Sequence, residues 1–189
     1  MISFIGNRPA LQIGPYQVTD YDVTWLDDAL RRAAAKAEVG DFPFLGEIRA
    51  AVILYLEHKC PLRLMPLDDL YAKLRRMLEQ IGCQPIADQL EPVAPPVTVS
   101  LLRVALEAGN GFELALFTTL RGNLAELRKE GAEKVRLVGV RPGILKLRGV
   151  EKWTAACDGL LGELRSFVSA WNAEQPAASR RLLVSLESH

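Results

Sequence analysis

Few side chains in this sequence have the types and spacing that acid–base chemistry needs. Three pairs of carboxylates are close enough along the chain to share a site: Asp27 with Asp28, Asp68 with Asp69, and Glu126 with Glu130. Each pair falls in the first turn or on the polar face of an expected helix, where the helix dipole and solvent stabilise negative charge. We therefore interpret these carboxylates as surface charges.

Metal-binding and nucleophilic patterns are not found either. The sequence has two histidines, His58 and His189, and three dispersed cysteines, Cys60, Cys83 and Cys157. His58 and Cys60 would supply two ligands, whereas a structural zinc site needs four, so we expect reduced structural thiols. The GxSxG, HExxH, GxGxxG and GxxxxGK[ST] motifs are absent from the sequence. We predict no metal site and no enzymatic activity.

One basic segment could bind an anion or a protein partner. Its cations are Lys134, Arg136, Arg141, Lys146, Arg148 and Lys152, opposed by Glu133 and Glu151. Two interpretations stay open: the solvated outer face of a sheet, or a partner surface formed by Arg136, Arg141, Lys146 and Arg148. The segment lacks the interleaved aromatic residues typical of single-stranded nucleic-acid binding, so nucleic acid is not the partner we expect.

The overall composition indicates a globular protein. The 189 residues are 49% hydrophobic and 24% charged, with a formal net charge of zero, which excludes the disordered and collagen-like classes. No apolar run approaches the roughly 20 residues of a membrane helix, and the first residues lack the basic start and apolar stretch of a signal peptide. We expect a cytoplasmic protein with no membrane partner.

A proline-rich segment divides the chain. Three prolines lie within residues 91–96, a composition typical of a stiff linker. Residues 1–95 hold 10 Lys and Arg against 13 Asp and Glu, and residues 96–189 hold 13 against 10. We predict two domains, 1–91 and 97–189, joined by this linker.

The first domain has the hydrophobic period of helices. Residues 10–18 alternate enough for one or two short strands. Three helices are predicted over 25–38, 45–58 and 67–81, and a short fourth helix follows Pro85. This part is therefore expected to be a helical domain with short leading strands.

The second domain is predicted to be richer in strands. Strands are expected over 97–107, 112–119, 134–140 and 144–148, with turns at 108–111 and 141–143. Helices are expected over 120–130 and 151–172, and residues 181–186 are a candidate last strand. The order ββαββα predicts an α+β fold with helices on one face of an antiparallel sheet. Because strand 97–107 is apolar on both faces, we also predict a homodimer through this domain.

The spacing of apolar residues over about 15–90 resembles the ATP-cone. This family is the small helical nucleotide-sensing domain of many ribonucleotide reductases and of their bacterial transcriptional repressor. Its F-D-x-x-K-I-type helix entry is matched by Tyr21-Asp-Val-Thr-Trp-Leu26, and its third-helix phrase G-x-x-x-V-A-x-x-Y by Gly82, Ile86, Ala87 and Leu90. Leu90 stands where the family usually has tyrosine.

The resemblance implies ATP or dATP as a ligand, but the cations that would hold the phosphates are missing. The family's V-x-K-R-D-G opening has no counterpart in residues 11–18, and Trp25 stands at the lysine of the helix entry. The candidate nucleotide-binding residues are Trp25, by stacking on adenine, and Arg31 and Arg32 one turn beyond. We expect nucleotide binding to be weak or lost.

Two functions are consistent with these features. The first is a non-enzymatic regulatory or sensor protein that pairs a diverged ATP-cone-like domain with an α+β domain for self-association or partner binding. The alternative is a chaperone-like or scaffold interaction protein with no nucleotide ligand. An enzyme that uses a cleft between the halves ranks last, because no catalytic constellation can be assembled.

Overall fold

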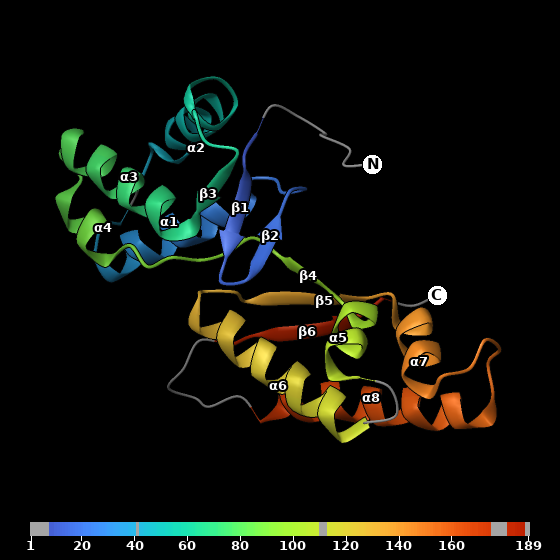
Figure 1. Ribbon diagram of the computed structural model, residues 1–189. Helices are drawn as coiled ribbons and strands as arrows, with labels where there is room; N and C mark the ends of the chain where they lie inside the picture. Colours follow the sequence, from blue (N-terminus) through green and yellow to red (C-terminus); the bar gives the residue numbers. More distant parts are fainter. Residues whose placement is uncertain (1–7, 41, 110–112, 175–180, 188–189) are drawn as a thin grey trace. The chain divides into compact units, whose positions relative to one another are not determined.

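The structure is a computed structural model that describes residues 8–40, 42–109, 113–174 and 181–187. The chain divides into two compact units, Met1–Pro95 and Pro96–His189 (Figure 1). The division falls inside the proline-rich segment 91–96. Both units mix helices and strands, and each has its own sheet and its own buried core.

The first unit combines a small mixed sheet with a group of helices. Its strands are β1 (Ala10–Ile13), β2 (Tyr16–Val18) and β3 (Leu64–Pro66). Its helices are α1 (Thr24–Lys36), α2 (Leu45–Leu54), α3 (Leu67–Gln80) and α4 (Gln84–Gln89), and a π-helical turn, η1 (Tyr55–Lys59), continues α2. The strand order is β2-β1-β3, with β1 antiparallel to β2 and parallel to β3. The helices predicted over 25–38, 45–58 and 67–81 correspond to α1, to α2 with η1, and to α3.

Apolar stripes at helical spacing build the core of the first unit. Leu26, Leu30 and Ala33 of α1 are buried, as are Leu70, Leu74 and Leu78 of α3. Gly82 ends α3 with φ of 81°, a left-handed conformation that glycine adopts at little steric cost. The chain can therefore turn sharply into α4.

The second unit contains a three-stranded parallel sheet. Its strands are β4 (Val97–Ser100), β5 (Lys134–Val138) and β6 (Leu183–Leu186), in the order β4-β5-β6. Parallel strands need crossover connections, and here each crossover is a pair of helices. The pairs are α5 (Leu101–Ala108) with α6 (Glu113–Lys129), and α7 (Val140–Arg148) with α8 (Ala155–Ala173).

This arrangement corrects the predicted antiparallel ββαββα sheet. Residues 101–107, 113–119 and 144–148, which we expected in strands, lie in α5, α6 and α7. The expected turn 141–143 also lies within α7, and part of the expected turn 108–111 lies outside the described residues. Runs rich in Leu and Ala favour helix, and their period is ambiguous when they are short.

Local signals in the second unit explain where its helices begin. The Ser100 hydroxyl caps α5 by accepting a hydrogen bond from the Arg103 backbone N–H at 3.4 Å. Pro142 lies in the first turn of α7, where a missing N–H costs little. The segment 97–107 is therefore a four-residue strand followed by a helix.

The two-sided apolar strand that suggested a homodimer does not exist.

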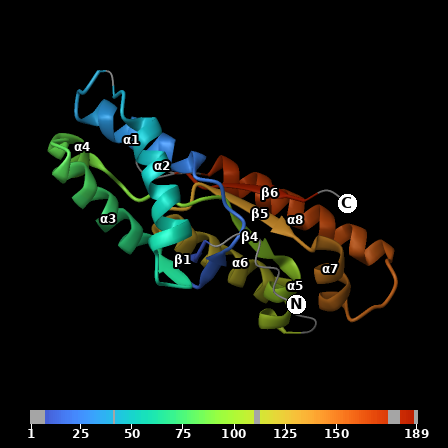
Figure 2. The same cartoon turned by 90° about the horizontal axis from the view of Figure 1, so that it is seen from above.

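The two faces of the parallel sheet differ in burial. Val97, Val99, Val135, Leu137 and Val184 are buried on one face. Thr98, Lys134, Arg136, Leu183 and Ser185 alternate with them and are exposed. In both views α8 runs beside β6, and α5 lies beside α7 (Figures 1 and 2).

Candidate functional site

Trp25, the residue at the family's lysine position, belongs to the core of the first unit. Its side chain is buried, and its indole Nε1–H donates to the Asp22 backbone oxygen at 2.8 Å. Its ring centroid lies 6.0 Å from that of the buried Tyr71. Stacking on adenine would require the ring to leave this packing. The role of Trp25 in this structure is therefore to pack in the core of the first unit.

The basic residues near α1 are mostly engaged or spread over its outer surface. Arg31 and Arg32 are exposed on α1, away from the stripe that faces the core. Lys36 pairs with Glu91 at 2.6 Å, and Arg49 of α2 pairs with Asp27 at 2.8 Å. Lys36 and Arg49 are therefore each neutralised by a carboxylate.

The candidate partner surface in the second unit is divided between two elements. Arg136 is exposed on β5, whereas Arg141, Lys146 and Arg148 belong to α7. The Arg141 guanidinium lies 5.0 Å from the Trp153 ring centroid, a cation–π contact. Arg148 forms an ion pair with Glu113 of α6, so it holds two helices together.

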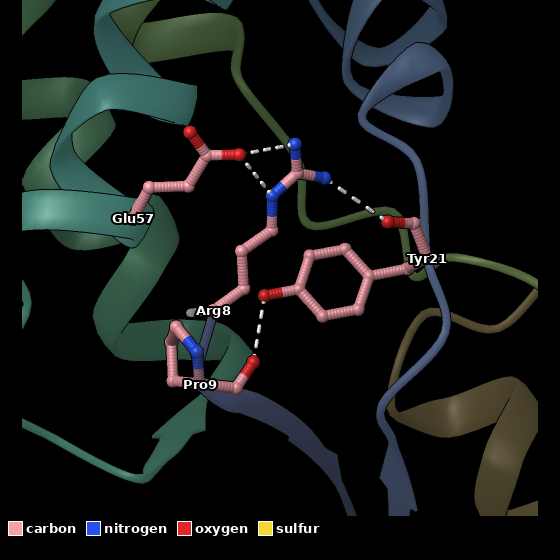
Figure 3. Close-up of polar contacts among 4 residues, drawn as sticks. All are labelled: Arg8, Pro9, Tyr21 and Glu57. Atoms are coloured by element: carbon pink, nitrogen blue, oxygen red, sulfur yellow. Dashed lines mark hydrogen bonds and ion pairs between the residues drawn. The ribbon is translucent and has the colours of Figure 1, made fainter. Parts of the chain in front are cut away.

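A polar cluster in the first unit joins three segments that are distant in sequence (Figure 3). The Arg8 Nε and Nη2 groups donate to Glu57 Oε1 at 2.8 and 2.6 Å, and Nη1 donates to the Tyr21 carbonyl oxygen at 3.3 Å. The Tyr21 hydroxyl donates to the Pro9 carbonyl oxygen at 2.7 Å. These contacts attach η1 to the residues that precede β1 and α1.

The electrostatics of this cluster suit a structural brace. Burial raises the pKa of Tyr21 to about 12, although the Arg8 guanidinium opposes part of this shift. The phenol therefore stays protonated and remains a hydrogen-bond donor at neutral pH. The charges of Arg8 and Glu57 compensate each other, so neither side chain is presented as an acid, base or anion site.

A concave apolar groove lies between α2 and α3. Its volume is about 240 Å³, and it is lined by Ala51, Val52, Tyr55, Leu70, Lys73, Leu74 and Met77. The buried side chains of Val52, Leu70 and Leu74 form its floor. At its edge the Lys73 ammonium lies 5.4 Å from the Tyr55 ring centroid. The groove thus combines an apolar interior with one cation.

Sequence reasoning missed this groove, although α2 carries a signal for it. The helix is apolar around most of its circumference, yet only Ile48 and Val52 of its ten residues are buried. Leu54 is 52% exposed, and Phe44, immediately before α2, is 49% exposed. An apolar helix with so much exposed surface indicates a face with room for a ligand or partner.

A second, more open groove lies between α6 and α8. Its lining residues are Phe117, Arg121, Gly162, Glu163, Ser166, Phe167 and Ala170. The Phe117 and Phe167 ring centroids are 5.4 Å apart, and the Arg121 guanidinium lies 5.5 Å from the Phe167 ring. This surface is shallow and mixes aromatic with charged groups, which is typical of a protein contact.

The described residues contain no group of three or more His, Cys, Asp or Glu side chains placed to hold a metal ion. The three cysteines are free thiols. No helix within the described ranges is both long enough and apolar enough to span a membrane. Comparisons with protein-family models, with curated proteins and with solved structures found no match.

Proposed function

We propose that this protein is a non-enzymatic regulatory or sensor protein. Its first unit is a diverged ATP-cone-like module in which nucleotide binding is weak or lost, and its second unit binds a protein partner. One contrast carries the proposal: the packing residues of the resemblance are present and buried, whereas the cations for a triphosphate are missing or paired.

The packing residues support the ATP-cone-like part of the proposal. Ile86, Ala87 and Leu90 are buried, and Gly82 has the positive φ that a turn after the third helix requires. These residues make up the third-helix phrase. The three apolar members of the phrase are buried, so packing gives them a physical reason to be retained after ligand binding has weakened.

The cations support the weak-binding part. Residues 11–18 form the β1–β2 hairpin without a Lys or Arg, and Lys36 and Arg49 are already paired with carboxylates. Each missing charge-assisted hydrogen bond to phosphate costs about 1.5–3 kcal/mol. Losing two or three would weaken a micromolar site by on the order of 10³-fold, to the millimolar range.

The open face of the parallel sheet supports partner binding by the second unit. Parallel sheets are usually covered on both faces, yet here Thr98, Lys134, Arg136 and Ser185 are exposed and Leu183 is 52% exposed. Neither Lys134 nor Arg136 has a carboxylate partner among the described residues. A partner with an acidic, partly apolar surface would complement this face.

Calorimetry with ATP and dATP on the intact chain tests the nucleotide part. We expect dissociation constants in the millimolar range, weakened further by Arg31→Gln and Arg32→Gln but unchanged by Arg76→Gln, an exposed residue on α3. Dissociation constants below about ten micromolar would show that the missing cations are supplied elsewhere. No binding at all would mean that nucleotide binding is lost, an outcome that agrees equally with the alternative, a scaffold protein without a nucleotide ligand.

A further inference from the structure

We propose that the groove between α2 and α3 binds a small amphipathic carboxylate, with an apolar body of roughly ten non-hydrogen atoms and one carboxylate group. The inference goes beyond the proposed nucleotide response and does not depend on the family resemblance. It is carried by the groove's size, its apolar lining, and the two polar groups at its edge.

The size and lining determine what the body of the ligand can be. A volume of about 240 Å³ is below the range typical of drug-sized ligands and fits a short alkyl chain or a single aromatic ring. Val52, Leu70 and Leu74 offer only apolar atoms, and Met77 can adjust its shape to the ligand. A nucleotide is both too large and too polar for this interior.

The edge of the groove determines the charge of the ligand. Lys73 is exposed and has no carboxylate within ion-pair distance among the described residues. The Tyr55 hydroxyl likewise has no hydrogen-bond partner in the described part of the chain. The Lys73 ammonium lies 5.4 Å from the Tyr55 ring centroid, so a carboxylate bound by Lys73 would lie close to Tyr55, whose hydroxyl is a second donor. A cationic ligand would be repelled by Lys73.

The polar cluster on η1 helps to preorganise this edge. Tyr55 is the first residue of η1, and Glu57, two residues later, is bound by Arg8 through two nitrogen atoms. The turn is thus anchored through a residue that is not part of the groove lining. An anchored turn loses less conformational freedom when a ligand binds.

Titration of the full chain with octanoate, 3-phenylpropionate and 1-octanol tests the proposal. We expect calorimetric dissociation constants on the order of 0.1–1 mM for at least one of the two carboxylates, with backbone amide shifts concentrated in residues 51–55 and 70–77. The comparison of octanoate with 3-phenylpropionate identifies an alkyl or an aryl body. The alcohol should bind about tenfold more weakly, because it cannot use the charge of Lys73.

Variants separate the anion site from a simple apolar surface. Lys73→Met should weaken the carboxylate about tenfold and leave 1-octanol unchanged, whereas Tyr55→Phe should weaken it a few-fold. Ala51→Trp, at an exposed position of the lining, should abolish binding by filling the groove. Arg76→Met, on the same helix but outside the lining, should bind like the unmodified chain. Circular dichroism verifies that each variant is folded.

Three outcomes would overturn the proposal. The first is equal affinity for octanoate and octanol, and the second is unchanged carboxylate affinity in Lys73→Met. The third is the absence of shifts in residues 51–55 and 70–77 with both carboxylates at about 5 mM, well above the expected dissociation constants. Because the nucleotide experiment uses different ligands and different residues, the two proposals can fail separately.

Discussion

Gly143 of α7 lies against the backbone of Leu101 in α5. A Cβ atom at position 143 would be 2.9 Å from the Leu101 carbonyl carbon and 3.0 Å from the Leu102 nitrogen. The two helices can approach this closely because position 143 has no side chain. Since α5 follows β4 and α7 follows β5, the contact also sets how the two crossovers of the second unit pack together.

Gly143→Ala should therefore destabilise the protein by about 1–3 kcal/mol, the usual cost of overpacking a site that cannot relax. The neighbouring atoms are backbone atoms, so a rotamer change cannot remove the clash. Urea unfolding followed by circular dichroism measures the effect. Gly122→Ala in α6 is the matched control: a Cβ there meets nothing within 4 Å, so it should stabilise by about 0.5–1 kcal/mol. Equal effects of the two substitutions would refute the close-contact explanation.

Asn172 of α8 forms hydrogen bonds with backbone groups at the outer edge of β6. Its Nδ2–H donates to the Val184 carbonyl oxygen, and its Oδ1 accepts from the Val184 N–H, both at 2.9 Å. Asn172→Ala should cost about 1–3 kcal/mol, because it leaves both backbone groups without this partner. The unfolding midpoint in urea measures the loss. Ser169→Ala, an exposed change on the same helix, should stay within about 0.5 kcal/mol of the unmodified chain. If the two variants are equally stable, the edge contact contributes nothing.

Tyr21 should make stability fall at alkaline pH. Its pKa is about 12 in the folded chain, and a free phenol titrates near pH 10. The higher pKa means that the folded state holds the proton more tightly than the unfolded state. The contribution of Tyr21 to the free energy of unfolding is therefore complete below about pH 10 and is lost as the pH rises towards 12. Between pH 8 and pH 11 the free energy of unfolding should decrease in both chains. The decrease should be larger by about 1.4 kcal/mol in the unmodified chain than in Tyr21→Phe. Parallel pH profiles for the two chains would contradict the assignment.

The two units should separate under limited proteolysis. The chain divides at Pro95–Pro96, so the first cuts should fall in or near residues 91–96 and release a helical N-terminal fragment. Mass spectrometry identifies the cut, and circular dichroism reports the structure of the fragment. Early cuts inside residues 25–90 without a stable fragment would show that the first unit does not fold by itself.

Light scattering tests the predicted homodimer, whose original argument no longer holds. The segment that was expected to be an apolar strand is mostly helix α5, with Leu101, Val104 and Ala105 buried within its own unit. The homodimer therefore stays a prediction without this argument, and a monomer at high micromolar concentration would count decisively against it. A dimer would require another surface, and the open groove beside Phe117 and Phe167 is then the first place for substitution.

The sequence by itself determined the helices of the first unit and the place where the chain divides. Leu70, Leu74 and Leu78 recur at helical spacing over a long segment, which leaves little ambiguity about the period. The prolines of residues 91–96 interrupt both helix and strand, whatever surrounds them. Each of these signals is local, so neighbouring residues are enough to predict the structure.

Only the tertiary structure decided the sheet of the second unit and the groove of the first. Short runs such as Leu101–Ala108 fit either a strand or a helix, and the choice depends on tertiary packing, which here includes the close contact between Leu101 and Gly143. Strand β3 has three residues and is defined by its pairing with β1, more than 50 positions earlier. The groove exists because Tyr55 and Lys73 are brought together from two helices. Long-range contacts of this kind leave no regular pattern in the sequence.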